Sequence, residues 1–401
     1  MTCYFISSSL FALILLTVVS VFPVNSKSPI IFIPGSFCSL LQVRINTTLQ
    51  PSCPDSLHNQ WILLWLNLRL FEPDLLPCYH QIFRMTYNFS SNSFDNPPGV
   101  ETRLVPNSIN GSFLDGVLWE YIGLDKFLFH FIQKYDYIDG LNIHSIPYDF
   151  RRGTTASLAV FLNQLKDLIE WSYVRNGNES VHLVSHSTGG SMVLYFLSQQ
   201  GQLWKDQYIN SWISLSGNIA GEVDNMESLI VGFLSPVVPR DVLQSWDFFA
   251  WRLPEPFIYG SQRTLVSTPS KNYTSADMLP FLHALNATEL ARVYPQASAI
   301  LSSLPAPNVN TYCFYGVNVS TPIAYISQSD DFDRRKLQTI HGDGDGEQDD
   351  TTNMSCQLWK QTMDRKYRLI LKGFDRVGHI ALVGNDQVLQ EIDQIISSTI
   401  L

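Results

Sequence analysis

The chain has 401 residues, of which 45% are hydrophobic and 12% aromatic, and its formal net charge is −10. This composition is rich enough in apolar residues to bury a large core, which argues against a disordered protein. The negative charge and the lack of any run rich in Lys and Arg argue against nucleic acid as a partner.

The first 26 residues have the pattern of a secretory signal peptide. An apolar stretch from Leu10 to Phe22 is followed by the small and polar residues Val24-Asn25-Ser26. This length suits the hydrophobic region of a signal peptide better than a membrane span, although the front end lacks Lys and Arg. We therefore predict a signal peptide over residues 1–26 and a folded domain over residues 27–401, with an uncleaved anchor as the alternative.

Glycosylation sequons and cysteines agree with a secretory route. Asn-X-Ser/Thr sequons mark surface sites in secreted proteins, and thiols oxidise in that compartment. Once Cys3 leaves with the signal, five of the six cysteines remain, so at least one is unpaired. No Cys-x-x-Cys or His-rich cluster indicates a metal site. The eight sequons are at Asn46, Asn88, Asn110, Asn178, Asn272, Asn286, Asn318 and Asn353.

Short apolar runs alternate with helical patterns along the rest of the chain. This alternation predicts a parallel sheet covered by helices on both faces. Residues 221–307 are irregular and rich in Pro, which predicts a cap inserted into the fold. The predicted strands are residues 29–34, 181–184, 212–215, 312–317 and 368–374, and the predicted helices are residues 157–172, 190–199 and 386–396.

The stretch "LVSHSTGGSM", residues 183–192, places Ser187 between a predicted strand and a predicted helix. A nucleophilic serine needs an exposed hydroxyl, a base and amide groups that meet the oxyanion, and a sharp strand-to-helix turn supplies the first and third of these. Small residues must flank such a serine, and here they are Ser185 and Gly189. The stretch therefore predicts Ser187 as a nucleophile, with a plain polar turn as the alternative.

A base and an acid follow in the order that this kind of site requires. In "FDRVGHIAL", His379 stands in a short loop between a predicted strand and the closing helix, where the base belongs. The stretch "IHGDGDGEQDD" before it offers several acids. His182 and His186 are too near the serine in sequence to reach back to it.

From about Pro29 to the C-terminus, the order of several distinctive motifs resembles the lecithin:cholesterol acyltransferase and lysosomal phospholipase A2 family. The resemblance implies an α/β-hydrolase fold, a mostly parallel sheet flanked by helices, with the cap at 221–307 and a small membrane-docking segment at 45–85. The motifs are "IIFIPGSF", "IPYDFRR", "LVSHSTGG", "LVSTPSKNYT", "LPAPNVNTYCFYGV", "GDGDG" and "VGHIAL".

The resemblance also implies roles for individual residues. Ser187 is the expected nucleophile, His379 the base and Asp345 the acid, chosen over Asp343 by counting back from Cys356 to the family's Gly-Asp-Gly turn. Asp343 stays the alternative. The expected oxyanion amides are those of Ser36 and Thr188, with Phe37 as the alternative to Ser36.

The expected disulfides are Cys53–Cys78 and Cys313–Cys356, which leaves Cys38 as the free thiol. Between the first pair lies "WILLWLNLRLF", residues 61–71, in which Trp61, Leu64, Trp65 and Leu68 recur at helical spacing. We predict that Trp61 and Trp65 form a lipid-docking surface, with a core helix as the alternative.

Two stretches depart from the family pattern. Glu347-Gln348 stands where the family usually has Thr-Val, which puts the geometry of the acid loop in doubt. "LSGNIAG", residues 215–221, replaces a Pro-Trp-Gly-Gly stretch that helps to shape the acyl pocket, so substrate preference does not carry over.

The resulting hypothesis is a serine-dependent lipid acyl-ester hydrolase or O-acyltransferase that acts on phospholipids through an acyl-enzyme. No metal or organic cofactor is expected. The expected partners are a phospholipid bilayer or lipoprotein surface and, as an acyl acceptor, a lipid alcohol. The expected location is the secretory pathway, either lysosomal or extracellular. The alternative is a lipid-binding or carrier protein on the same fold with a weakened acid loop.

Overall fold

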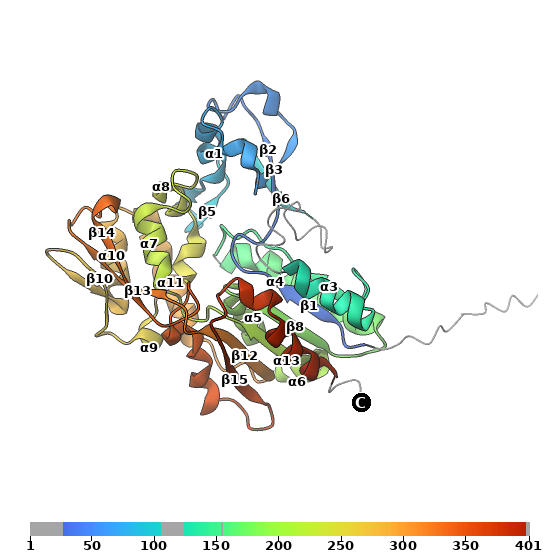
Figure 1. Cartoon of the computed structure of the whole chain (residues 1–401). Coiled ribbons are helices and arrows are strands. Elements are labelled where there is room, and N and C mark those ends of the chain that lie inside the picture. Colours follow the sequence, from blue (N-terminus) through green and yellow to red (C-terminus); the bar gives the residue numbers. More distant parts are fainter. Residues whose placement is uncertain (1–26, 106–123, 154, 398–401) are drawn as a thin grey trace, which may run out of the picture.

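A computed structural model describes residues 27–105, 124–153 and 155–397, so the predicted signal peptide and the Asn110 sequon lie outside the described residues. Its centre is a six-stranded sheet in the order β15-β12-β9-β8-β1-β7, and every neighbouring pair is parallel (Figure 1). This confirms the predicted parallel sheet. Its strands are β1 (Ile30–Ile33), β7 (Ile143–Ser145), β8 (Val181–His186), β9 (Ile209–Leu215), β12 (Asn310–Val317) and β15 (Leu369–Asp375).

Helices cover both faces of this sheet because successive side chains of each strand point to opposite sides. In β1, Ile30 and Phe32 pack in one cluster with apolar residues of α3 and α13, whereas Ile31 and Ile33 pack in the other with residues of α4 and α5. All four residues are buried. The helices on the two faces are α3 (Leu124–Tyr135) and α13 (Asp386–Ser397), then α4 (Thr155–Arg175), α5 (Gly189–Ser198) and α6 (Gln202–Tyr208).

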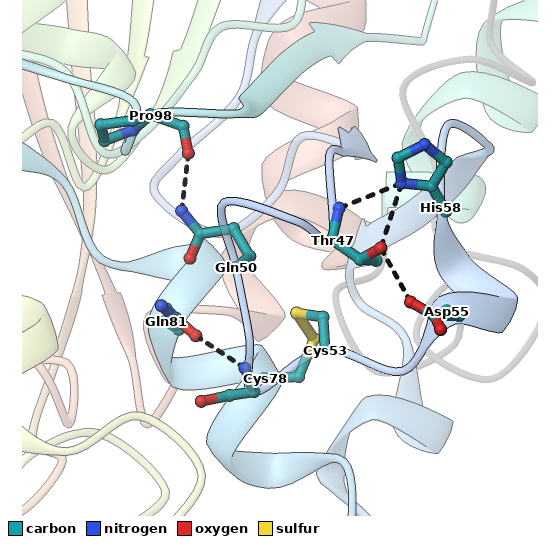
Figure 2. Close-up of a disulfide and its surroundings, with 9 residues drawn as sticks. Thr47, Gln50, Cys53, Asp55, His58, Cys78, Gln81 and Pro98 are labelled. Carbon is teal, nitrogen blue, oxygen red and sulfur yellow. Dashed lines mark hydrogen bonds between the residues drawn. A yellow bond between two sulfur atoms is a disulfide. The ribbon is translucent and has the colours of Figure 1, made fainter.

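Residues 41–104 form a separate unit, here called the disulfide subdomain, at one end of the molecule (Figure 1). The Cys53–Cys78 disulfide joins the loop after β2 to α1 (Figure 2). Nearby, the Gln50 side chain donates to the Pro98 carbonyl at 2.7 Å, so the unit extends beyond the predicted segment 45–85. Its elements are the antiparallel sheet β2 (Leu41–Ile45), β3 (Trp61–Trp65) and β6 (Val100–Leu104), the pair β4 (Thr86–Asn88) and β5 (Ser93–Asp95), η1 (Asp55–Leu57), η2 (Leu68–Phe71) and α1 (Leu76–Phe83).

The helical reading of residues 61–71 is wrong. Trp61–Trp65 is strand β3, which pairs with β2 in antiparallel register, and a 3₁₀ turn begins at Leu68. A short apolar run does not distinguish a helix from a buried strand by its period, and the aromatic residues here favour a strand. The pairing with β2, in which Trp65 lies opposite Leu41, 24 positions earlier in the chain, decides between a helix and a strand.

The cap lies beside the central sheet and contains a second sheet, in the order β11-β10-β13-β14 (Figure 1). Strands β13 and β14 come from residues 321–342, beyond the predicted cap boundary at 307. The cap elements are α7 (Asp224–Val231), α8 (Arg240–Leu243), η4 (Asp247–Trp251), α9 (Pro256–Tyr259), β10 (Thr264–Ser267), β11 (Asn272–Thr274), η5 (Ser275–Asp277), α10 (Met278–Ala284), α11 (Thr288–Ser303), β13 (Thr321–Ser327), η6 (Arg334–Lys336) and β14 (Leu337–Gly342).

Three short helical segments follow, namely α12 (Asp350–Asn353), η7 (Ser355–Lys360) and η8 (Ala381–Gly384). Within the described residues, no helix is both long enough and apolar enough to cross a bilayer.

The sequons differ in their accessibility. Asn46 is half-buried, and Asn353 is only 4% exposed and donates from its side chain to the Gln348 carbonyl at 3.0 Å. Asn353 is therefore part of the packing behind the acid loop and cannot carry a glycan in this fold. The exposed sequon residues are Asn88, Asn178, Asn272, Asn286 and Asn318.

Candidate active site

Ser187 occupies the turn between β8 and α5, with a left-handed φ of 54°. Its amide donates to the Leu215 carbonyl at 3.0 Å, and its carbonyl accepts from the amides of Gly190 at 2.8 Å and Asn218 at 3.0 Å. A non-glycine residue in this conformation is strained, and such strain is typical of a nucleophile at a strand-to-helix turn. The turn places Ser187 at the carboxyl edge of the central sheet, where ligands bind in open α/β folds.

The turn is crowded on both sides, which explains the small residues around Ser187. A Cβ atom on Gly189 would lie 2.4 Å from the Ile33 carbonyl oxygen, and one on Gly35 would lie 2.9 Å from the Ser187 Cβ. Ser185 takes the position that is usually glycine. It is fully buried, and its hydroxyl accepts from the Trp212 indole at 2.9 Å, so the larger residue has its own polar partner.

Gly189→Ala should lower the free energy of unfolding by about 1–3 kcal/mol, because the added methyl group meets backbone atoms that have no room to move. Thermal melting measures the loss. Gly201→Ala is the matched control. An added Cβ there meets nothing within 4 Å. Alanine caps the start of a helix less well than glycine but also restricts the unfolded chain, so these two effects on the free energy of unfolding should cancel to within about 0.5 kcal/mol. Equal melting of the two variants would show that β1 and α5 approach each other less closely than described.

His379 and Asp345 form a buried pair. The His379 Nδ1 atom lies 2.9 Å from the Asp345 Oδ2 atom, and the His379 amide donates to the Asp345 carbonyl at 2.7 Å. The other carboxylate oxygen of Asp345 accepts from the amides of Glu347 at 3.1 Å and Gln348 at 2.7 Å. Asp343 is exposed and accepts from the Asn318 amide at 2.6 Å. The structure therefore brings Asp345 to His379 and leaves Asp343 at the surface.

The charges of this pair are set by opposing effects. Burial pushes the pKa of Asp345 up, but the adjacent His379 and the amide donors outweigh it and hold that pKa below its usual value. Burial likewise pushes the pKa of His379 down, but the carboxylates of Asp345 and Glu347 outweigh it and raise that pKa to about 10. Asp345 is therefore held ionised, and its charge makes His379 a stronger base than a free imidazole.

The proton-accepting nitrogen of His379 is not engaged by the serine in this conformation. Within the described residues, the buried Nε2 atom has no hydrogen-bond partner. The nearest charged atom is Oε2 of Glu347, at 3.6 Å. Catalytic hydrogen bonds are often long before substrate binds, so this geometry is compatible with a serine–histidine pair that tightens later.

The two predicted oxyanion residues lie side by side. The Ser36 and Thr188 hydroxyls are 2.9 Å apart, which ties the turn after β1 to the elbow after β8. Phe37, the alternative, has a left-handed φ of 61°, and its carbonyl accepts from the Trp65 indole at 2.7 Å. Its ring stacks on Phe233 of the cap, with 4.6 Å between ring centroids. The oxyanion turn therefore contacts both the cap and the disulfide subdomain.

Three residues that the sequence did not place in the site also contact it. His186 is buried, and its Nε2 atom lies 3.1 Å from the His379 carbonyl oxygen. Burial lowers the pKa of His186 to about 3, so its ring is neutral and donates to that carbonyl. Gln348 donates to the Ser216 carbonyl at 3.0 Å, and Glu347 faces His379. Only the departure from the family pattern pointed to Glu347 and Gln348, and no spacing pointed to His186.

Comparison with known proteins gives the family of the chain. The family model described as "Lecithin:cholesterol acyltransferase" matches residues 61–293, which is more than half of the 401 residues. The chain belongs to the lecithin:cholesterol acyltransferase family. It is 26% identical to the "Lysosomal phospholipase A and acyltransferase" of Homo sapiens, covering 96% of this chain and 95% of that protein. It is 29% identical to the "Phosphatidylcholine-sterol acyltransferase" of Gallus gallus, covering 89% and 88%.

A solved structure supports the fold of this family member. A chain in the crystal structure of the Tle4-Tli4 complex superposes with a TM-score of 0.51 at 11% identity, covering 92% of this chain and 98% of that chain. Together with the parallel sheet and its flanking helices, this likeness confirms the predicted α/β-hydrolase fold.

The structure corrects the expected docking surface of this family member. Trp65 is 4% exposed and packs against Phe83 of the subdomain and Phe37 of the oxyanion turn, so it belongs to the core between them. Trp61 is half-buried, and its ring lies under the guanidinium groups of Arg103, at 4.2 Å, and Arg44, at 5.3 Å. The two Trp residues differ in exposure because β3 begins with Trp61 at the outer edge of the subdomain and ends with Trp65 beside the oxyanion turn.

The cysteines pair as the family resemblance implies. Besides Cys53–Cys78, a Cys313–Cys356 disulfide joins β12 to η7, just beyond the acid loop. Cys38 is free, and burial raises the pKa of its thiol to about 12, so it is neutral and a poor nucleophile. Across the described ranges, no three His, Cys, Asp or Glu side chains form a group that could hold a metal ion.

Proposed function

We propose that this protein is a serine-dependent acyl-ester hydrolase and O-acyltransferase that acts on phospholipids through an acyl-enzyme. Membership of the family assigns lipid acyl transfer to the chain, and the names of the relatives in Homo sapiens and Gallus gallus point to phospholipids as acyl donors. Two observations carry the finer proposal: the strained Ser187 elbow at the carboxyl edge of the sheet, and the 2.9 Å His379–Asp345 pair from loops at the same edge.

The reaction begins with a proton transfer. His379 takes the Ser187 proton on Nε2 while the serine oxygen attacks the ester carbonyl, and Asp345 stabilises the resulting imidazolium. The amides of Ser36 and Thr188 are the proposed donors to the oxyanion. The intermediate then collapses, the ester C–O bond breaks, and His379 gives its proton to the departing lysophospholipid oxygen. An acyl group remains on Ser187.

The second half of the reaction decides the product. Water or a lipid alcohol gives its proton to His379 and attacks the acyl-enzyme, which frees Ser187. Bulk water outnumbers any lipid alcohol, so transfer to an alcohol needs a dry site that holds it close. The ring of Phe37 in the oxyanion turn contacts two aromatic rings of the cap, those of Phe233 and Trp246. These contacts support a water-poor site between the turn and the cap.

The disulfide subdomain is the proposed docking surface for a phospholipid bilayer or a lipoprotein. Leu68, in the turn after β3, is 62% exposed, and Trp61 is half-buried beside two Arg residues. An exposed apolar side chain suits contact with lipid tails, and an aromatic ring stacked under cations suits the headgroup boundary. The proposed location is lysosomal, following the name of the relative in Homo sapiens, or extracellular, following the predicted signal peptide.

Trp61→Ser should weaken binding to phosphatidylcholine vesicles several-fold and largely spare hydrolysis of a short soluble ester. Trp65→Ser should damage both, because Trp65 is buried and donates to the Phe37 carbonyl beside the oxyanion turn. Vesicle co-sedimentation and soluble-ester kinetics, run on both variants, measure the two effects. Equal loss on both assays for Trp61→Ser would remove Trp61 from the docking surface.

Two measurements test the proposed function. A fluorophosphonate should label the wild-type protein covalently, and peptide mapping should place the label on Ser187. Phosphatidylcholine vesicles, supplied with and without a lipid alcohol from acidic to slightly alkaline pH, should yield free fatty acid and, with the alcohol, its ester. A protein that binds the vesicles but is neither labelled nor active is instead a lipid carrier, which would overturn the proposal.

A further inference from the structure

A second carboxylate faces the catalytic imidazole. Oε2 of Glu347 lies 3.6 Å from Nε2 of His379, while Asp345 holds the opposite ring nitrogen at 2.9 Å. Within the described residues, Nε2 has no hydrogen-bond partner and Glu347 has no other ion-pair partner within 4.0 Å. The imidazole therefore lies between two carboxylates from one loop, and the one at Nε2 occupies the side from which the Ser187 proton must arrive.

The loop that positions Asp345 also positions Glu347. The Asp345 carboxylate accepts from the Glu347 amide, and the Asp345 amide donates to the Gln348 carbonyl at 3.0 Å. Between them Gly346 has a φ of 100°, which favours glycine and reverses the chain. Gln348 then anchors the loop to Ser216 at 3.0 Å. The turn is therefore fixed at both ends, and the direction of the Glu347 side chain follows from it.

The other ionisable groups near His379 and Glu347 are either in ion pairs or uncharged. Glu222 is buried and forms an ion pair with Arg252. The groups that face His379 or Glu347 are Asp345 from the same loop, His186 from β8, Cys38 from the turn after β1, Glu222 from the segment after β9, Asp224 from α7 and Arg252 from the cap. The His186 ring and the Cys38 thiol are uncharged, as described above. Burial raises the pKa of Asp224 to about 8, so it also carries little charge at neutral pH.

The Glu347 side chain reaches solvent. Its side chain is 39% exposed, whereas that of His379 is 3% exposed. Rotation of Glu347 toward solvent therefore leaves the core packing intact. In this conformation its carboxylate faces Nε2 at 3.6 Å, on the side where a proton on that nitrogen would lie.

Building on the proposed function, we propose that Glu347 is a positioning residue for the reaction: its carboxylate holds Nε2 of His379 in the resting enzyme and sets the pH range of turnover. The base works only when neutral, so activity appears as pH rises through the pKa of His379. Because the Glu347 carboxylate raises that pKa, its removal moves the acid limb of the pH–rate profile to lower pH.

Glu347→Gln and Glu347→Ala test the proposal, since both remove the charge and only one changes the size strongly. The readout is the pH dependence of the rate at which a soluble fluorophosphonate labels Ser187, together with kcat/KM for a soluble ester. Neither readout requires a membrane. Both variants should shift the midpoint of the acid limb down by about one pH unit or more, which makes them about tenfold faster than wild type below the wild-type midpoint. Glu347→Asp, which keeps the charge, should stay nearer to wild type than to the neutral variants.

Asp343→Asn is the matched control, because it removes a carboxylate from the same loop that does not contact His379. Its acid limb should coincide with that of wild type. An unshifted midpoint in both neutral variants, or an equal shift in Asp343→Asn, would overturn the role of Glu347. Failure of the proposed function is a separate result, in which the wild-type protein itself shows neither labelling nor ester turnover.

Discussion

Ser187→Ala should lower ester turnover by several orders of magnitude, on the order of 10⁶-fold in kcat, as in serine hydrolases whose nucleophile is removed. The protein should still fold. The Ser187 backbone is held by Leu215, Gly190 and Asn218, and these bonds do not involve its hydroxyl. Removal of the hydroxyl therefore leaves the hydrogen bonds that hold this turn in place.

The measurement is kcat on phosphatidylcholine vesicles, together with fluorophosphonate labelling and thermal melting of the same preparation. Ser191→Ala is the control, since Ser191 is a buried serine one turn further along α5 whose hydroxyl donates to the Asn218 carbonyl. That variant should lose some stability and keep its chemistry. Turnover by Ser187→Ala within tenfold of wild type, in a folded preparation, would exclude the acyl-enzyme.

The sequence predicts the central sheet well because parallel strands are buried on both faces and read as apolar runs. The predicted strand at 181–184 is part of β8, Val181–His186, whose six residues are all buried, and the predicted closing helix at 386–396 is α13. The helical spacing at residues 61–71 misleads, because the apolar run 61–66 suits either structure and the partner strand β2 decides. Strands β13 and β14 are not predicted, because they belong to the separate sheet of the cap and not to the buried central sheet.

The site likewise has parts that the sequence predicts and parts that it does not. The motifs around Ser187 and His379 are each a short stretch of the chain, so they can be recognised from the sequence alone. The contact between Glu347 and His379 spans 32 residues and depends on how one turn directs a side chain, and no pattern in either stretch encodes it. The same holds for His186, whose contact with the His379 carbonyl joins residues 193 positions apart. Tertiary packing creates these contacts.

Asp345→Asn should lower kcat by about 10⁴-fold, whereas Asp343→Asn should change it by less than about threefold, following the loss seen when the acid of a serine triad is replaced by its amide. The Asp345 carboxylate accepts from His379 Nδ1 at 2.9 Å and from two backbone amides. An asparagine amide placed there offers one oxygen in place of two. It either gives up the backbone donors or turns its NH₂ group toward Nδ1, which puts the imidazole proton on the wrong nitrogen.

The electrostatic effect has the same direction as the structural one. The Asp345 carboxylate raises the pKa of His379, so the amide lowers it and weakens the base as well as misorienting it. The acid limb of the pH–rate profile should therefore move to lower pH even as the plateau falls. Asp343, at the surface and bonded to the Asn318 amide, offers Nδ1 no such contact, and asparagine can still accept through its side-chain oxygen there. A larger loss from Asp343→Asn than from Asp345→Asn would mean that the acid loop shifts by one turn in the working enzyme. Comparing kcat and the acid limb for the two variants, each with its melting temperature, decides which carboxylate supports His379 during turnover.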